Sequence, residues 1–209
     1  VMEYLIDEWL PFDGKDVELA NDDLKKAAVF LAAVQDIGKA TPLFQQKLLK
    51  HIGFLQKSLD KAGLNVDCKN VEDSPKDGSH ALMGAFLLCH AKVPEAYAAI
   101  VGSHHGHTPD DGYNKSGNSS SSIGSRGSWY YGASQASWSA AQNGCVELAL
   151  RFAGVSSLDA LPNLNKAAQF LLSALVIMAD WIASNTEYFP LIAQEDAPNC
   201  QNRVKSGLE

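Results

Sequence analysis

The chain has 209 residues, of which 46% are hydrophobic, and it carries a formal net charge of −7 at pH 7. This length fits one domain or one lobe of a larger protein, with enough apolar residues to bury a core. The acidic charge argues against a stand-alone nucleic-acid binder, which needs a basic face. Four scattered cysteines without a Cys-x-x-Cys pair indicate neither a zinc knuckle nor a disulfide framework. Apolar runs are broken before membrane-spanning length and no signal sequence is evident, so we expect a cytoplasmic protein without a membrane partner.

The first part of the chain is predicted to be helical. Residues 1–10 already follow a helical pattern. Asp22 and Asp23 place negative charge where it favours a helix N-terminus, and the helix that they open is predicted over 24–34. This helix delivers Asp36 at its C-terminal end.

A break, a helix and a loop are predicted next. Gly38 and Pro42 interrupt the helical pattern. Residues 44–59 indicate a second helix, in which His51 is interpreted as a surface histidine. The polar residues 60–78, rich in Asp, Lys and Asn, indicate a loop.

A strongly apolar helix is predicted to begin at His80. Ser79 is a good N-cap, which places His80 in the first helical turn, and His90 is interpreted as a helix-end histidine. Pro94 suits the first turn of the following helix, which is predicted to end near Val101.

Two adjacent histidines, His104 and His105, follow that helix in a tight turn between Gly102 and Gly106. Adjacent histidines between glycines are unusual in a packing role, so this pair favours a functional one. His107 continues the His-rich turn and is interpreted as part of an exposed loop.

Residues 107–128 differ in composition from the rest of the chain, because they are rich in Ser and Gly. This composition predicts a flexible loop. The aromatic residues 129–131 follow at once. They either stack on unpaired bases or anchor the loop to the core, and we favour the anchor.

The last part of the chain contains two predicted helices. Residues 134–153 indicate an amphipathic helix, and residues 165–183 indicate a second helix whose centre is apolar on almost every face. Such a helix is expected to be central to the fold. Asp180 lies near its end with nothing polar around it, so its carboxylate needs a partner, because an unpaired buried charge is strongly unfavourable.

Several of these phrases resemble a known family. The runs 36–44, 80–82, 104–106 and 179–185 are similar to the HD nuclease domain of the CRISPR-associated helicase-nuclease, the type I effector, and most similar to its type I-E variety. The phrase that begins at Asp36, Asp-Ile-Gly-Lys-Ala-Thr-Pro-x-Phe-Gln, is fairly specific to this branch. The resemblance extends over most of the chain and implies an all-α fold: an HD-domain helical bundle, a single domain over 1–209, with a metal site at its centre.

The resemblance also implies two metal positions that share one aspartate. The ligands of one position are all present: Asp36, His80, His104 and His105. Imidazole and carboxylate ligands of this kind suit one or two divalent ions of Mn, Fe, Co or Ni.

The ligands of the other position are incomplete. Asp36 and Asp180 are present, but Gln35 stands where the family has the His of its His-Asp pair, and no histidine precedes His51. The first His of the family is therefore expected just upstream of Val1, on a helix that the chain enters part-way. Gln35 can offer only a neutral amide oxygen, which is a poorer ligand, so we expect at most one tightly held ion.

The resemblance implies a metal-dependent DNA endonuclease domain that degrades single-stranded DNA in type I CRISPR interference, an antiviral defence. Asp36 would bridge the ions, and Lys39, by itself an ordinary solvated charge, would face the phosphate. The expected partners are single-stranded DNA, a helicase domain of the same protein beyond Glu209, and the CRISPR surveillance complex. The helicase and that complex would hold most of the DNA, which accommodates the acidic net charge.

Two alternatives stay open. Gln35 and the missing first His favour a catalytically inactive HD scaffold that serves as a docking lobe for the same effector. A nucleotide phosphohydrolase of the wider HD superfamily is the other alternative, and the phrases at 40–42 and 180–181 count against it.

Overall fold

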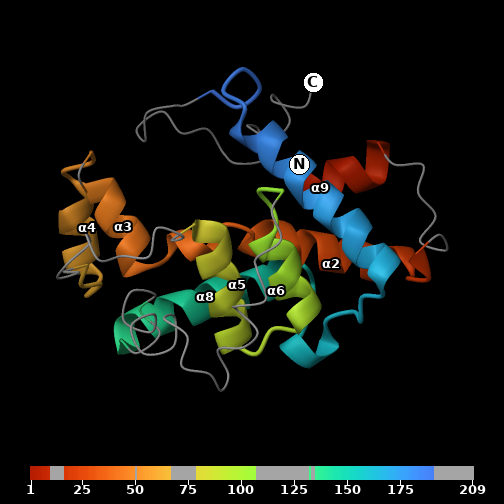
Figure 1. The fold of residues 1–209 in the computed structure, drawn as a ribbon, viewed down its shortest axis with the longest axis horizontal. Helices are drawn as coiled ribbons and strands as arrows, with labels where there is room; N and C mark the ends of the chain where they lie inside the picture. The colour runs from red at the N-terminus through yellow and green to blue at the C-terminus, as the bar shows by residue number, and fades with distance from the viewer. Residues whose placement is uncertain (10–16, 50, 67–78, 107–131, 133–134, 191–209) are drawn as a thin grey trace.

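The structure is a computed structural model that describes residues 1–9, 17–49, 51–66, 79–106, 132 and 135–190. Every regular element in these ranges is a helix, which confirms the predicted all-α fold. Figure 1 shows the elements, which are α1 (Met2–Tyr4), η1 (Leu5–Trp9), α2 (Asn21–Val34), η3 (Ile37–Lys39), α3 (Pro42–Leu49), α4 (Leu55–Lys61), α5 (His80–His90), α6 (Glu95–Gly102), α8 (Ala136–Phe152), η6 (Leu158–Ala160) and α9 (Lys166–Ser184).

Helix α2 is the centre of the arrangement, because it packs against α1, α6, α8 and α9 (Figure 1). Helices α5 and α6 lie side by side and have the most extensive contact between any two elements of the described part. The short helix η3, which follows α2, lies against α5. The chain that leaves the central helix therefore runs directly onto the α5–α6 pair.

A large hydrophobic core joins these helices. The buried side of α2 contributes Leu24, Ala27, Ala28, Phe30, Leu31 and Val34. A small second cluster at one end combines Leu59, Val66 and Trp138. The indole Nε1–H of Trp138 donates to the carbonyl of Asn65 at 2.7 Å, which satisfies the polar atom of this buried ring.

The prediction of one helix over 44–59 is wrong. Two helices, α3 and α4, occupy this stretch, and a turn that includes Gly53 separates them. Helix α3 starts earlier than predicted, at Pro42, whose fixed φ suits a first helical position. The Thr41 hydroxyl accepts a hydrogen bond from the Phe44 N–H at 3.3 Å and so caps this helix.

Other sequence predictions hold. Helix α2 covers the predicted 24–34, α8 lies within the predicted 134–153, and α5 begins at His80. The Ser79 side chain accepts from the Leu82 N–H at 3.2 Å, as an N-cap does. The predicted loops lie mainly outside the described residues: most of 60–78, all of 107–128 with His107, and the aromatic residues 129–131.

Helix α9, expected to be central to the fold because its centre is apolar on almost every face, buries only one of these faces in the described structure. One face packs into the core through Leu172, Leu175 and Val176, whereas Phe170 is 79% exposed and Trp181 is 71% exposed. By length and composition α9 could cross a membrane, contrary to the expectation that no apolar run is long enough. Its contacts with α2 and α6, however, are those of a core helix in a helical domain.

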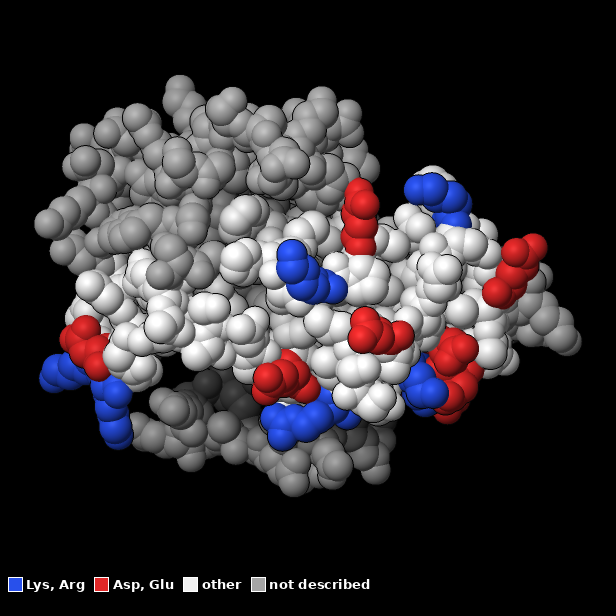
Figure 2. All heavy atoms as spheres, turned by 90° about the horizontal axis from the view of Figure 1, so that it is seen from below, with Lys and Arg blue, Asp and Glu red and all other residues white. Residues whose placement is uncertain are grey.

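Charged side chains are mixed on the face shown in Figure 2. Basic and acidic residues lie interspersed over its described part, and neither sign forms a continuous patch. Elsewhere in the described part, charges of opposite sign pair locally, as Lys25 does with Asp7 at 2.6 Å and Lys26 with Asp22. The described part of this face therefore does not form the basic surface that binds nucleic acid without help.

Candidate metal centre

Asp36 occupies the turn between α2 and η3. Val34 before it is fully buried and Ile37 after it is 6% exposed, so the core fixes the turn on both sides of the carboxylate. The next positions of the turn are tied down through their backbone. Three consecutive carbonyls each accept a side-chain hydrogen bond: Gly38 from Thr41 Oγ1 at 2.9 Å, Lys39 from Gln45 Nε2 at 2.8 Å and Ala40 from Gln142 Nε2 at 2.8 Å.

His80 comes to Asp36 from the first turn of α5. Its Nε2 atom lies 3.2 Å from Asp36 Oδ1. The edge of its ring meets the ring of Phe44, with 5.7 Å between the ring centroids. The N-cap that starts α5 therefore also determines where this imidazole stands.

His104 and His105 come from the turn that ends α6. Gly106, directly after the pair, has φ of +82°, a conformation that favours glycine. His104 is 2% exposed, and its Nδ1 atom lies 2.6 Å from the Val101 carbonyl. A carbonyl can only accept, so Nδ1 carries the proton and Nε2 is left with its lone pair free for a ligand bond.

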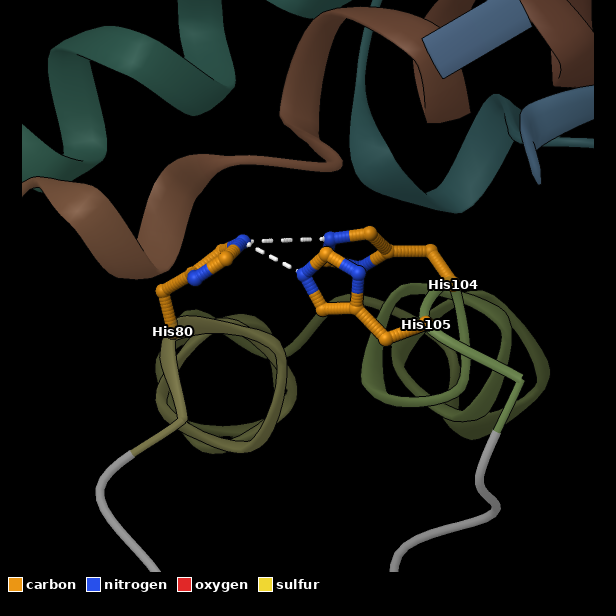
Figure 3. Close-up of side chains that lie close together, drawn as sticks. All are labelled: His80, His104 and His105. Atoms are coloured by element: carbon orange, nitrogen blue, oxygen red, sulfur yellow. Dashed lines mark hydrogen bonds between the residues drawn. The ribbon is translucent and has the colours of Figure 1, made fainter. Parts of the chain in front are cut away.

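The three imidazoles point toward one another between α5 and α6 (Figure 3). His80 Nε2 lies 3.3 Å from His104 Nε2 and 2.9 Å from His105 Nε2. One ligand atom from each ring lies within 4.8 Å of the others. The cluster is sealed on the His104 side and opens to solvent at His105, which is exposed.

These separations fit a metal centre. Two ligand atoms that each lie about 2.1 Å from one ion, at tetrahedral or octahedral angles, are about 3.0–3.4 Å apart. The contacts of His80 Nε2 with both histidines and with Asp36 fall at 2.9–3.3 Å. The donor set of three imidazoles and one carboxylate suits a divalent ion of borderline softness.

The protonation states also suit ligands. Burial raises the pKa of Asp36, but hydrogen bonds from His80 and Lys39 outweigh it and hold this pKa at about 2. Partial burial, together with repulsion from His104 and His80, lowers the pKa of His105. The carboxylate is therefore ionised and the His105 imidazole is neutral near pH 7, as metal ligands must be.

Lys39 lies within the site. Its Nζ atom is 2.7 Å from Asp36 Oδ2, on the opposite carboxylate oxygen from the one that meets His80. Both partners are partly exposed, so the ion pair is accessible to solvent. The structure thus places Lys39 against the carboxylate, beside the position where we expect a phosphate.

Asp180 joins the site through Gln35. The Gln35 amide Nε2 donates to Asp180 Oδ1 at 3.2 Å, which supplies the partner that this carboxylate needs. Gln35 Oε1 is buried and, among the described residues, has no hydrogen-bond partner. An orphaned buried oxygen beside a carboxylate is a feature that a cation would satisfy.

The two histidines for which no functional role is predicted lie apart from this cluster. His51 is exposed, and His90 is exposed at the other end of α5 from His80, where its ring stacks against Phe86. The supporting residues Thr41, Gln45 and Gln142 were not singled out from the sequence. A Thr directly before a Pro that starts a helix could have indicated the capping role of Thr41. The contact of Gln142 with Ala40 spans 102 residues, so no local sequence pattern could have indicated it.

The helical scaffold carries a carboxylate just after its central helix and a cluster of three histidines, one of which meets that carboxylate, and this combination defines a domain of the HD type. The chain matches the profile of the family described as Cas3, HD domain, over residues 1–189, and it belongs to that family.

Two relatives illustrate the similarity. The chain is 37% identical over 200 residues to the CRISPR-associated nuclease/helicase Cas3 of Streptococcus thermophilus, with 88% of this chain and 21% of the relative covered. The chain thus spans about a fifth of that protein's length. A solved structure described as a CRISPR-associated protein shares the fold, with a TM-score of 0.70 at 22% identity, over 99% of this chain and 23% of the other. Neither name states a subtype, so type I-E stays a prediction.

Proposed function

We propose that this domain is a metal-dependent nuclease that cuts single-stranded DNA in CRISPR interference. The observation that carries the proposal is the cluster of His80, His104 and His105, whose ligand atoms lie within 4.8 Å of one another, with Asp36 3.2 Å from His80 Nε2. The family relationship adds that a relative with 37% identity is named as a nuclease/helicase.

Each residue of the site has a proposed role. Asp36 and the three histidines hold the ion, and the Val101 carbonyl keeps the His104 ring in the tautomer that leaves Nε2 free. When bound, such an ion lowers the pKa of a coordinated water and polarises the phosphoryl group. Lys39, once it turns from Asp36, offers its charge to the phosphate oxygens.

The same site supports one tightly held ion rather than two. Asp180 accepts a hydrogen bond from the Gln35 amide, so part of its lone-pair capacity is already used. Gln35 Oε1 is a neutral ligand and binds a transition metal more weakly than imidazole. We therefore assign the second position to Asp36, Gln35 and Asp180, filled only at high concentrations of Mn, Fe, Co or Ni.

The substrate must be brought to this domain by other parts of the system. The net charge of −7 and the mixed charges of Figure 2 provide little attraction for a polyanion. We propose that residues 1–209 act as a single domain beside a helicase domain of the same protein, in the cytoplasm, and that the CRISPR surveillance complex delivers the DNA strand.

Metal loading and cleavage of circular single-stranded DNA test the proposal. The purified domain is stripped with chelator and then titrated with Mn²⁺, Co²⁺ or Ni²⁺. His80→Ala should lose tight metal binding and cleavage, because His80 contacts every other ligand of the first position. His90→Ala is the matched control, since it removes an exposed imidazole from the far end of the same helix. Cleavage that persists in chelator, or equal activity of the two variants, would contradict the proposal.

A docking scaffold without activity is the second candidate, and the Gln35–Asp180 hydrogen bond favours it because it occupies a family ligand. The same titration separates the candidates. A scaffold binds one ion at the three histidines but leaves DNA uncut with every metal, whereas a nuclease cuts at a rate that follows metal occupancy.

A further inference from the structure

The backbone of η3 lies directly on the backbone of α5. A Cβ atom built on Gly38 would stand 1.8 Å from the His80 carbonyl oxygen and 2.7 Å from the Gly84 nitrogen. Gly84 faces it across the crossing, where its own Cβ would stand 3.4 Å from Gly38 N and 3.0 Å from Val101 Cγ1. Glycines on both elements thus allow an approach that side chains would prevent.

The requirement at Gly38 is for space and not for an unusual conformation. Gly38 lies within the 3-10 helix η3 and has no positive φ, so other residues could adopt its backbone geometry. The carbonyl that a side chain would strike belongs to His80, the residue at the centre of the ligand contacts.

We infer that Gly38 is a positioning residue of the metal centre, which sets the separation of Asp36 from His80 although it has no ligand atom itself. This inference rests on the proposed function. Asp36 lies two residues before Gly38 on the same turn, and its Oδ1 atom is 3.2 Å from His80 Nε2. The absent side chain lets the turn settle on α5 at the distance that one ion can bridge.

The turn cannot absorb an added methyl group locally. Its carbonyls are tied to Thr41, Gln45 and Gln142, and Ile37 is held in the core. Normal contacts between heavy atoms are about 3.5 Å, against the 1.8 Å found here, so the turn and α5 would have to separate by roughly 1.7 Å. Ligand distances at a metal tolerate only about 0.2 Å, so such a separation takes Asp36 out of the coordination sphere.

Co²⁺ binding tests this role, because its visible absorption reports the number and geometry of ligands. Gly38→Ala should bind Co²⁺ at least about 10-fold more weakly, the scale of supporting substitutions at metal sites, with a changed spectrum. Adding Asp36→Glu to Gly38→Ala should recover part of the affinity, because the longer side chain spans the added distance.

Two controls separate positioning from loss of stability. Gly144→Ala adds the same methyl group where nothing lies within 4 Å and should bind Co²⁺ as the unsubstituted protein does. Leu172→Ala removes a fully buried side chain of α9 and should lower the melting temperature while the Co²⁺ affinity and spectrum of the folded protein stay unchanged.

Each outcome decides the inference. If Gly38→Ala folds and binds Co²⁺ with the original affinity and spectrum, the inference is overturned while the proposed function stands. If the unsubstituted protein does not bind Co²⁺, both are overturned. If Gly38→Ala does not fold, Asp36→Glu in the otherwise unsubstituted protein decides. If the separation of Asp36 from His80 is fixed, the longer side chain should bind Co²⁺ more weakly and with an altered spectrum. Unchanged Co²⁺ binding overturns the inference.

Discussion

Asp36 uses both oxygens of its carboxylate within the site. One carboxylate oxygen meets His80 and the other meets Lys39, so the charge is balanced before any ion is bound. These contacts hold the pKa of Asp36 at about 2, below the ordinary value near 4 for an aspartate. Its ionised form is therefore favoured by the folded state.

Acid unfolding should reveal this preference. A pKa that is lower in the folded state contributes stability that is present above the unfolded value and lost as the pH falls through the folded value. Without metal, the free energy of unfolding should decrease between about pH 4 and pH 2, and Asp36→Asn should flatten that part of the curve. Urea unfolding at a series of pH values measures it, with Asp159→Asn, which changes an exposed carboxylate of η6, as the control. An identical slope for both variants would count against the contacts of Asp36.

In the proposed site, Gln35 is the residue that would limit the second metal position. Gln35→His should raise the metal stoichiometry from one ion toward two and raise the cleavage of single-stranded DNA about 10-fold or more, because an imidazole replaces a neutral amide beside Asp180. Atomic absorption and a DNA degradation assay at equal metal measure the two effects. An unchanged stoichiometry would show that Asp180 is not a ligand.

At the scale of elements, α8 reaches the site without contributing a ligand. Its Gln142 side chain is 5% exposed and donates to the Ala40 carbonyl in the turn after η3. The hydrogen bond is partly buried, and a polar group that loses its partner in such a place costs about 1 kcal/mol or more. The hydrogen bond between Gln142 and Ala40 therefore couples the position of α8 to the turn that carries Asp36.

Gln142→Ala should lower the free energy of unfolding by about 1–3 kcal/mol and also weaken metal binding, because the turn is released on one side. Asn143→Ala removes an exposed amide from the neighbouring position of α8, so it is the matched control and should change neither quantity. Denaturant unfolding and a metal titration measure both. A loss of stability with full metal affinity would limit Gln142 to packing.

The sequence predicted elements well where local signals agree. The start of α5 follows from Ser79, and α2 follows from its acidic first turn and apolar period. The split between α3 and α4 was missed because one apolar pattern continues across the turn near Gly53. The prediction that Asp36 lies near the histidines rested on the family resemblance. Local sequence patterns cannot predict a contact between residues that are far apart in the chain.

At the scale of the whole molecule, α9 exposes large apolar side chains on the face that points away from the core. Phe170 and Leu172 are two positions apart in an apolar run, yet the first is 79% exposed and the second is fully buried. Hydrophobicity alone could not distinguish the two residues, because the burial of each side chain depends on helices that are distant in the sequence.

These two positions should respond differently to the same change. Leu172→Ala should lower the free energy of unfolding by about 2–5 kcal/mol, since it leaves a cavity in the core. Phe170→Ala should change it by no more than about 0.5 kcal/mol, as at other surface positions. Thermal unfolding compares them directly. A large effect at Phe170 would mean that another part of the chain covers this face.

The candidate ligands belong to three separate helical segments: one ends just before Asp36, one begins at His80 and one ends just before His104. An ion held by all three would act as a reversible cross-link that closes long loops of the chain. Such a cross-link binds the folded state and not the unfolded one, and it stabilises by about 2.7 kcal/mol when the free ion is at 100 times its dissociation constant. The supply of metal in the surroundings would then set the lifetime of the fold as well as its chemistry.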